Sequence, residues 1–407
     1  MATQHSAPAA ARGWIVTFAG LGINLALGIL YTWSLFKAAI GKEFGWKDQQ
    51  LNDPYALCCL VFAFTMILAG RCQDKLGPRV TASIGGLLVG AGLVLISTTN
   101  SYAMWLLGFG VLVGVGIGFG YSSTTPPALK WFPPAKTGLI AGLVVAGFGL
   151  APIYLAPVSQ YLLTNFGVQK SMLIFGVAFT VIVCGLAQFL KNPPGGFVSA
   201  PKMANAAPSA AVNFSPGEML RQPVFWLLWV LYFIGSGAGL MVISSVSGMA
   251  KKTMGEQAFI AVAVMAIGNA GGRIIAGILS DKIGRRWTLM LVLLIQAALM
   301  FIAIPVTAST DGAKCIIVLV ATLIGFNYGA NLALFPSFTK DFWGLKNFGM
   351  NYGILFTSWG VGGFVLSRVQ QMLKTSSGDF KSSFTTAGVL LLVGVGLTFF
   401  IKSPKEK

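Results

Sequence analysis

Residues 257–286 read QAFIAVAVMAIGNAGGRIIAGILSDKIGRR, in which an apolar run, 258–279, carries one charge, Arg273, near its middle and is followed by SDKIGRR. A run of this length is long enough to cross a bilayer as a helix. At about 1.5 Å of rise per residue, Arg273 lies roughly 12 Å inside the end marked by Asp281, within the hydrocarbon. A cation at that depth costs roughly 3 kcal/mol or more, so we expect it to face a partner or a water-filled cavity.

The residues around Arg273 fit a helix that packs closely and presents a polar face. Asn269 lies four residues earlier, on the same helical face. Small residues that let a neighbouring helix approach are Gly268, Gly271, Gly272 and Gly277. We interpret Arg273 as a functional residue, because charge inside a membrane is usually functional. The alternative is an arginine that bonds helix carbonyls and serves only packing.

The composition of the whole chain is that of a membrane protein. It has 407 residues, of which 55% are hydrophobic and 10% charged, with a mean hydropathy of +0.77. Soluble chains carry about a quarter charged residues. The net charge of +17 could suggest nucleic acid, but the basic residues are spread over short connections and form no single patch. We therefore expect the lipid bilayer, and no nucleic acid, as a partner.

The sequence offers little for catalysis or metal binding. Its five cysteines show neither CxxC nor metal-ligand spacing, and its single histidine, His5, lies in a polar tail. A phosphate-binding G-x-x-x-x-G-K-[ST] loop is also absent. We expect a protein that is not an enzyme and has no metal and no cofactor.

Twelve apolar segments predict an all-α membrane protein with twelve transmembrane helices. They cover residues 14–39, 52–70, 80–98, 103–129, 138–161, 171–190, 223–249, 257–280, 287–308, 315–339, 349–371 and 383–402. Residues 191–222 are rich in Pro, Ala, Ser and Asn and predict a linker. The expected domains are a six-helix half at 1–190 and another at 223–407.

The distribution of Lys and Arg predicts the orientation. With both termini on one side, the connections on that side hold more Lys and Arg than those on the other. Because basic connections stay in the cytoplasm, both termini and the linker are expected there, in a multi-pass protein of the plasma (inner) membrane.

The end of the opening stretch has a counterpart earlier in the chain. Residues 70–79 read GRCQDKLGPR and residues 277–286 read GILSDKIGRR, with Asp, Gly and the final Arg at matching positions. Two halves with the same loop in the same place indicate a duplication. Such aspartates can cap a helix or pair with a base, so the loops predict a cytoplasmic gate formed by Asp74, Arg79, Asp281 and Arg286.

These loops resemble the signature loop of the major facilitator superfamily, G-x-x-x-D-[RK]-x-G-[RK]-[RK]. The second copy matches it, whereas the first has Pro78 where the family usually has a base. The resemblance implies two six-helix bundles in the major facilitator fold. It also implies a secondary transporter that alternates its access between the two sides, with a substrate site at the midplane between the halves.

Further segments are similar to the oxalate:formate antiporter and monocarboxylate transporter branch of that family. They are YTWSL at 31–35, KWFP at 130–133, LFP at 334–336 and NYGIL at 351–355. That branch has an arginine in the eighth helix as the counter-ion of a substrate carboxylate. The matching position here is Arg273, which implies a small carboxylate as substrate.

Two departures from the branch narrow the expected function. Trp359 stands where the oxalate:formate antiporter has a second cation, a lysine, so the site should favour a monoanion such as lactate or pyruvate. Asn269 stands where animal monocarboxylate transporters have an aspartate, so a carboxylate proton relay is missing. The resemblance implies symport of the monocarboxylate with a proton. Anion exchange and a non-transporting receptor on the same fold remain as alternatives.

Four aromatic side chains with polar tips complete the expected substrate site. Tyr31, Tyr121, Tyr328 and Trp359 can offer apolar walls and a hydroxyl or indole N–H to a small acid. Tyr121 aligns with a binding-site tyrosine of the antiporter. The alternative for each is ordinary packing between helices. We expect these four residues, with Asn269 and Arg273, to bind substrate in a monomer.

Overall fold

The computed structural model describes residues 6–194, 213–254, 258–308, 314–377 and 381–403, and these contain helices and no strand. The earlier elements are α1 (Ser6–Leu27), η1 (Gly28–Thr32), α2 (Trp33–Phe44), α3 (Asp48–Leu76), α4 (Pro78–Ser97), α5 (Tyr102–Trp105), η2 (Leu106–Val113), α6 (Gly114–Lys130), η3 (Pro134–Lys136) and α7 (Thr137–Ala187). The later elements are α8 (Pro216–Leu220), α9 (Pro223–Met254), α10 (Ala258–Ile283), α11 (Arg285–Ala308), α12 (Lys314–Trp343), α13 (Phe348–Ser377) and α14 (Lys381–Thr398).

Each of the twelve predicted segments falls on these helices. Ten described stretches are long and apolar enough to cross a membrane. One of them, 134–187, is 54 residues long and holds two passes, because the chain turns at Gly167 (φ 73°, ψ 178°). The 30-residue α13 is not among the ten, and it supplies the remaining pass. The predicted all-α fold with twelve transmembrane helices in two six-helix bundles is confirmed.

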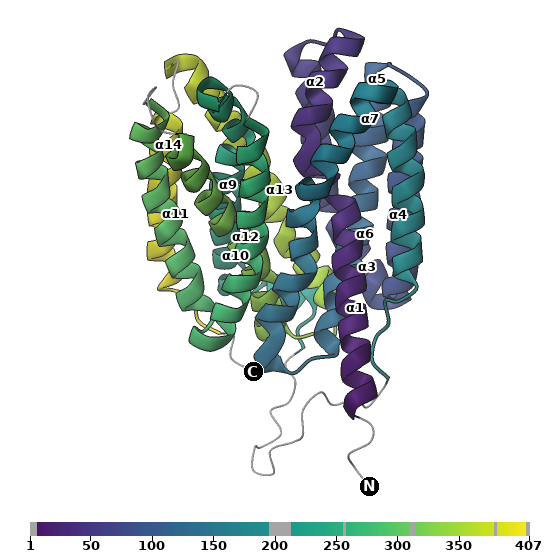
Figure 1. Ribbon diagram of the computed structural model, residues 1–407. Coiled ribbons are helices and arrows are strands. Elements are labelled where there is room, and N and C mark those ends of the chain that lie inside the picture. Colours follow the sequence, from purple (N-terminus) through teal and green to yellow (C-terminus); the bar gives the residue numbers. More distant parts are fainter. Residues whose placement is uncertain (1–5, 195–212, 255–257, 309–313, 378–380, 404–407) are drawn as a thin grey trace, which may run out of the picture.

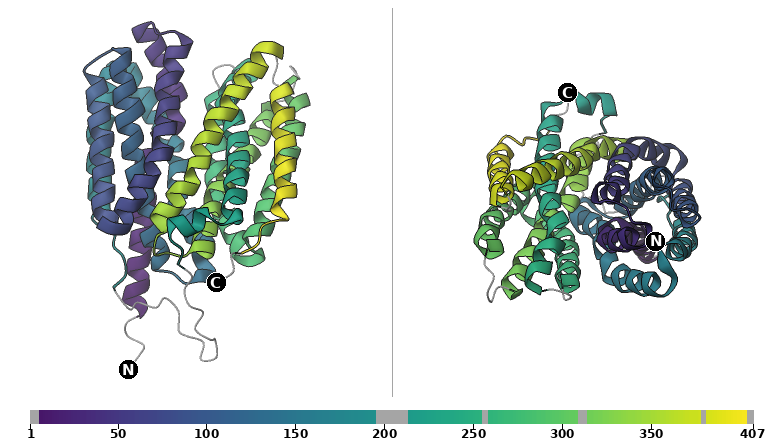
Figure 2. Two further views of the ribbon diagram at one scale, coloured as in Figure 1. Left: turned by 180° about the vertical axis from the view of Figure 1, so that it is seen from behind. Right: turned by 90° about the horizontal axis from the view of Figure 1, so that it is seen from above.

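The two bundles stand side by side (Figure 1). Helices α1 to α7 form one bundle, and α9 to α14 form the other. The bundles lean together at the end of the molecule where α3 and α10 end, which we call the inner end, and they spread apart at the opposite end (Figures 1 and 2). The linker predicted between the halves lies mostly outside the described residues, at 195–212.

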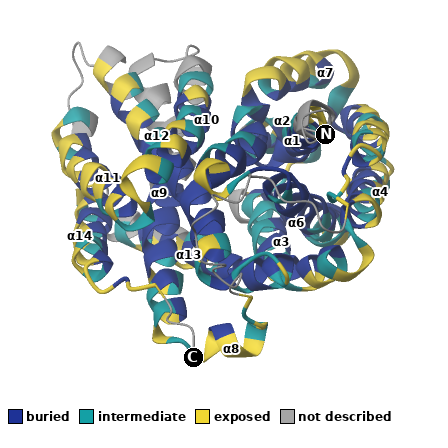
Figure 3. Ribbon diagram, turned by 90° about the horizontal axis from the view of Figure 1, so that it is seen from below, coloured by how far each residue is buried: buried dark blue, intermediate teal, exposed yellow. Residues whose placement is uncertain are grey.

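Burial follows the pattern of a protein in lipid. Seen from below, buried residues fill the interior of each bundle and line the contact between them, and exposed residues lie on the outer surface (Figure 3). Many of these exposed residues are large and apolar, including Leu68, Val181 and Phe400. Such a surface suits hydrocarbon, because lipid tails are as apolar as the side chains that face them.

At the inner end the two bundles touch backbone to backbone. A Cβ atom on Gly277 of α10 would lie 2.2 Å from the carbonyl oxygen of Gly138 in α7. A Cβ atom on Gly349 of α13 would lie 2.5 Å from the carbonyl oxygen of Gly70 in α3. Any larger residue at these glycines would force the helices apart. Glycine is therefore what brings the two halves close enough to bond each other at this end.

The sequence repeat corresponds to a repeat in backbone geometry. Gly77 (φ 85°) joins α3 to α4, and Gly284 (φ 91°) joins α10 to α11. Both angles lie in the region that favours glycine, and both residues let the chain reverse within one residue. The same turn in both halves agrees with a duplication.

Candidate functional site

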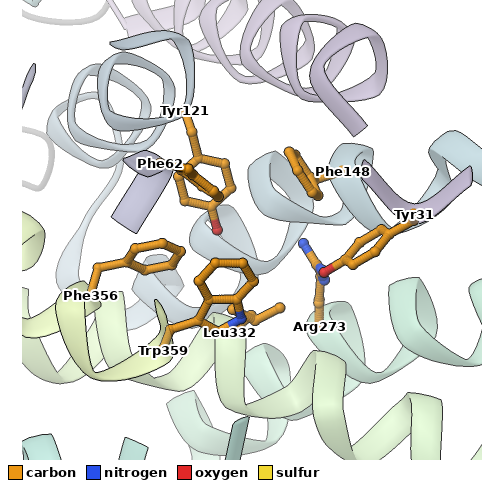
Figure 4. Close-up of a pocket in the computed structure, with 8 residues that line it drawn as sticks. All are labelled: Tyr31, Phe62, Tyr121, Phe148, Arg273, Leu332, Phe356 and Trp359. Carbon is orange, nitrogen blue, oxygen red and sulfur yellow. The ribbon is translucent and has the colours of Figure 1, made fainter. Parts of the chain in front are cut away.

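A pocket lies between the two bundles near the middle of the membrane helices (Figure 4). Its volume is about 10 Å³, enough for about one water molecule. Side chains from both bundles line it: Tyr31, Phe62, Tyr121, Phe148, Arg273, Leu332, Phe356 and Trp359. A substrate larger than water can enter only if these side chains move.

Arg273 is the charged group of this pocket, and it is fully buried (0% exposed). Its Nε donates to Oδ1 of Asn269 at 2.9 Å, and its Nη2 donates to the hydroxyl of Tyr31 at 3.3 Å. Its Nη1 donates to the carbonyl oxygen of Val145 in α7. All three acceptors are neutral, and no described carboxylate forms an ion pair with Arg273. The guanidinium is hydrogen-bonded, but its charge has no counter-ion among the described residues.

A chain of hydrogen bonds extends from Arg273 across the pocket. The hydroxyls of Tyr31 and Tyr328 lie 2.9 Å apart, and Nε1 of Trp359 donates to the Tyr328 hydroxyl at 3.0 Å. Tyr31 lies in η1, a short 3-10 turn that interrupts the first pass between α1 and α2. Such an interruption often marks a functional position in a helix. The chain joins η1 of the first bundle to α10, α12 and α13 of the second.

Tyr121 completes the set of residues that the sequence predicted for this site. Its ring packs against Phe62 (5.5 Å between centroids), Phe148 (5.7 Å) and Phe356 (5.6 Å). Its hydroxyl points toward the pocket (Figure 4). The structure thus brings all six predicted residues together: four line the pocket, and Asn269 and Tyr328 bond residues that do.

Sequence reasoning missed several groups at this site. The apolar wall made by Phe62, Phe148 and Phe356 was not predicted, because nothing marks these three among the 30 phenylalanines of the chain. The carbonyl of Val145 was missed because a backbone group leaves no trace in a sequence. The packing interpretation of Arg273 did foresee a bond to a helix carbonyl, and the structure shows that bond together with a position in the pocket.

The two repeat aspartates bind the first turns of helices in the opposite bundle. The carboxylate of Asp281 accepts from the N–H groups of Gly138 (2.8 Å) and Leu139 (3.0 Å), at the start of α7. The carboxylate of Asp74 accepts in the same way from Gly349 (3.1 Å) and Met350 (3.0 Å), at the start of α13. Free N–H groups and the positive end of the helix dipole favour a carboxylate there. Both contacts tie the bundles together at the inner end.

The arginines predicted for the gate lie elsewhere. Nε of Arg79 donates to the carbonyl of Leu190 at 3.1 Å, within its own bundle. The guanidinium of Arg286 lies over the ring of Trp287, 5.1 Å from its centroid. The base that reaches Asp281 is Arg285, at 2.6 Å from Nη1 to Oδ1, and its Nε also pairs with Asp341 at 2.8 Å. The motif could not show which of two adjacent arginines faces the aspartate.

We expect Asp74→Asn and Asp281→Asn to weaken the closed inner end. Each change removes a charge from a helix start, which is worth about 1 kcal/mol and shifts the population of the open inner end by about fivefold. Substrate affinity should stay within a few-fold, because both residues lie away from the pocket. Distances between spin labels on the two bundles measure the population and the exchange between states.

Glu43→Gln is a matched control for these two variants. Glu43 also binds a helix N–H, that of Val168 at 2.9 Å, but both residues belong to the first bundle. Its loss should leave the distances between bundles unchanged. Wild-type distances and exchange rates in both aspartate variants would show that these contacts do not hold the inner end closed.

Comparison with known proteins identifies relatives of this chain. A family model described as Major Facilitator Superfamily matches residues 14–367 and 256–407. The chain is 31% identical over 361 residues to the uncharacterized MFS-type transporter YhjX of Escherichia coli (strain K12), which covers 86% of this chain and 85% of that protein. It is 26% identical over 401 residues to the oxalate:formate antiporter of Oxalobacter formigenes, with coverage of 96% and 91%.

Two further comparisons extend this result. The chain is 25% identical over 396 residues to human monocarboxylate transporter 11, covering 94% of this chain and 81% of that protein. Among solved structures, it is similar to a Major Facilitator Superfamily transporter, FucP, in the outward conformation. The TM-score is 0.70 at 16% sequence identity, with coverage of 95% of this chain and 98% of that one. At that identity the likeness concerns the fold alone.

Proposed function

This chain belongs to the Major Facilitator Superfamily, and on that premise we propose that it is a secondary active transporter of short monocarboxylates such as lactate and pyruvate. As a member of this family it is a membrane transporter and not an enzyme. We propose that the substrate binds between the bundles, at the pocket around Arg273. The observation that carries the proposal is a fully buried arginine whose described partners are all neutral.

The chemistry of the pocket supports a small monoanion. A guanidinium binds a carboxylate through two parallel N–H bonds, and a carboxylate would supply the negative charge that the described contacts of Arg273 lack. Tyr31 and Tyr121 offer hydroxyl groups for a second oxygen of the substrate, and the phenylalanine rings and the ring of Trp359 offer a surface for its short alkyl part. A second carboxylate would be desolvated here without a cation beside it, which disfavours a dianion.

We propose that a proton accompanies the monocarboxylate. The six residues of the site include no Asp or Glu, so the proton would travel with the substrate carboxylate or through a tyrosine hydroxyl rather than on a carboxylate side chain. The rival proposal is anion exchange of the oxalate and formate kind. It is favoured by the 26% identity to an oxalate:formate antiporter over nearly the whole chain.

We further propose a location and an assembly state. The excess of Lys and Arg on the side of both termini supports a cytoplasmic inner end in the plasma (inner) membrane of a bacterium. We propose that the protein works as a monomer, because residues from both bundles of the same chain line the pocket on its opposite sides. In this orientation the contacts of Asp74 and Asp281 close the cytoplasmic side, and the spread end of the bundles faces outward.

Uptake by purified protein in liposomes tests the function. We expect labelled L-lactate to enter faster when the outside is more acidic than the inside, because the proton gradient then drives symport. Unlabelled pyruvate should compete with lactate, and oxalate should not. Uptake that does not depend on the proton gradient and requires an unlabelled anion inside the liposomes would favour anion exchange. Competition by oxalate alone would contradict a monocarboxylate site.

A further inference from the structure

We propose that Arg273 is also a tie between the two bundles, and that substrate releases it. The bond from Arg273 to the carbonyl of Val145 joins α10 of the second bundle to α7 of the first. A substrate carboxylate would compete with that carbonyl for the same guanidinium. Binding would therefore loosen one of the contacts that keep the inner end closed. The release step rests on the proposed function, whereas the tie itself is a property of the protein without substrate.

The helix that carries Val145 is built to lie against Arg273. A Cβ atom on Gly142 would lie 2.3 Å from the carbonyl oxygen of Arg273, and one on Gly149 would lie 3.2 Å from its Nε. Residues 142, 145 and 149 are three and four apart, so they share one face of α7. Two glycines thus leave the backbone of α7 bare on both sides of the carbonyl that accepts the bond. Arg273 reaches it without any side chain of α7 between them.

The turn of α7 that carries Val145 is bonded within the first bundle. Asn24 of α1 donates through Nδ2 to the neighbouring carbonyl of Val144 at 2.9 Å and to Oγ1 of Thr124 at 3.2 Å. On the other side, Asn269 fixes the plane of the guanidinium through its bond to Nε. The bond between Arg273 and Val145 therefore links two groups that are each anchored in their own bundle, so relative movement of the bundles must break or distort it.

A carboxylate can displace the carbonyl of Val145. A carboxylate can bind a guanidinium through two parallel charge-assisted bonds, and it also neutralises the buried cation, which a neutral carbonyl cannot do. The terminal nitrogens Nη1 and Nη2 now bond Val145 and the hydroxyl of Tyr31. Each of these nitrogens carries two N–H groups, so a bidentate carboxylate competes with both acceptors and neutralises the charge that strengthens their bonds. The bond between Tyr31 and Tyr328, which also crosses between the bundles, would then lose its link to Arg273.

The released contact belongs to the same pair of helices as one of the inner-end ties. Asp281 of α10 binds the first turn of α7 at Gly138 and Leu139, and Arg273 binds α7 two turns further along. Helices α7 and α10 are thus joined at two heights. The loss of the upper bond to substrate removes one of these two links between α7 and α10, and the closed state becomes less favoured.

Spin labels at the inner end test the tie without any substrate. Leu76 at the end of α3 and Ile283 at the end of α10 are 59% and 45% exposed and belong to different bundles. The labels are attached at Leu76→Cys and Ile283→Cys in a background without other cysteines. In this background we expect Arg273→Met to raise the fraction of molecules with a long distance between the two labels by about tenfold, because it removes a hydrogen bond to a charged group. L-Lactate should shift the wild-type protein in the same direction and should not shift Arg273→Met further.

Glu43→Gln is the matched control, because it removes a bond within the first bundle, to the N–H of Val168, without removing a contact between bundles. Its distances should equal those of the wild type. If Arg273→Met does not fold, the wild type decides: L-lactate should lengthen the distance, and lactamide, which lacks the carboxylate, should not.

Two outcomes overturn the proposal. The first is a substrate-free Arg273→Met protein with wild-type distances between the labels, since Arg273 would then not hold the two bundles together. The second is an equal shift by lactamide and lactate. If Arg273→Met opens the inner end but L-lactate neither binds nor is transported, the tie stands and the proposed substrate is wrong.

Discussion

Arg273→Gln is expected to abolish uptake of short monocarboxylates by a protein that still folds. The change removes the charge and leaves an uncharged polar group. At an effective dielectric constant near 20 and roughly 4 Å separation, the lost ion pair with the substrate is worth up to about 4 kcal/mol, or about a thousandfold in affinity. Uptake of labelled L-lactate into liposomes measures the loss, and thermal unfolding in detergent shows whether the variant is intact.

Arg368→Gln is the control for this prediction. Arg368 also lies in a membrane helix, α13, but it is exposed, and its guanidinium lies over the ring of Phe364 at 5.6 Å from the centroid. It lines no part of the pocket. We expect nearly normal uptake by this variant. Normal uptake by Arg273→Gln would instead show that Arg273 is not the counter-ion of the substrate.

The fold could be predicted from the sequence because a bilayer leaves a chain few options. Backbone groups in hydrocarbon must be satisfied within helices, so apolar length alone placed the twelve passes. The turn at Gly167 falls in the gap predicted between segments 138–161 and 171–190. The 3-10 segment that carries Tyr31 was not visible in this way, because it lies inside the apolar run 14–39, where hydropathy does not change.

The polar residues of the site could be predicted for a related reason. Polar groups are costly within a membrane, so Arg273 and Asn269 stood out, and resemblance to a transporter branch added Tyr121 and Trp359. The sequence could not show which side chains of neighbouring helices face one another. Arg285 rather than Arg286 reaches Asp281, because adjacent residues on a helix point in directions about 100° apart.

One motif found in the sequence has a structural role away from the pocket. Asn351, the first residue of the NYG stretch, donates through Nδ2 to the carbonyl of Phe214 at 3.1 Å, and Asn347 donates to the same oxygen at 3.2 Å. Phe214 lies just before α8, in the last part of the predicted linker (191–222). The motif therefore fastens the end of that segment to the start of α13, beside the turn that Asp74 binds.

Trp359→Lys is expected to shift the selectivity of the site from monoanions toward oxalate. Trp359 lines the pocket together with Arg273, stacks on Phe356 at 5.0 Å between centroids, and bonds the Tyr328 hydroxyl. A lysine there would add a second cation. At an effective dielectric constant near 20 and roughly 5 Å separation, the new charge pair is worth up to about 3 kcal/mol before the lysine is desolvated. The ratio of oxalate to lactate affinity should rise about tenfold, which calorimetry at fixed pH and salt can measure.

Trp359→Met is a control that distinguishes the effect of the added charge from the effect of losing the indole. It also removes the bond to Tyr328 and the contact with Phe356, but it introduces no cation, so lactate should bind more weakly and the ratio of the two affinities should change little. The lysine variant must exceed this control for charge to be the cause. If a folded Trp359→Lys protein has an oxalate-to-lactate ratio no higher than that of the wild type, the number of cations in the pocket does not set its selectivity. The preference for a monoanion would then have to come from the size and shape of the aromatic wall.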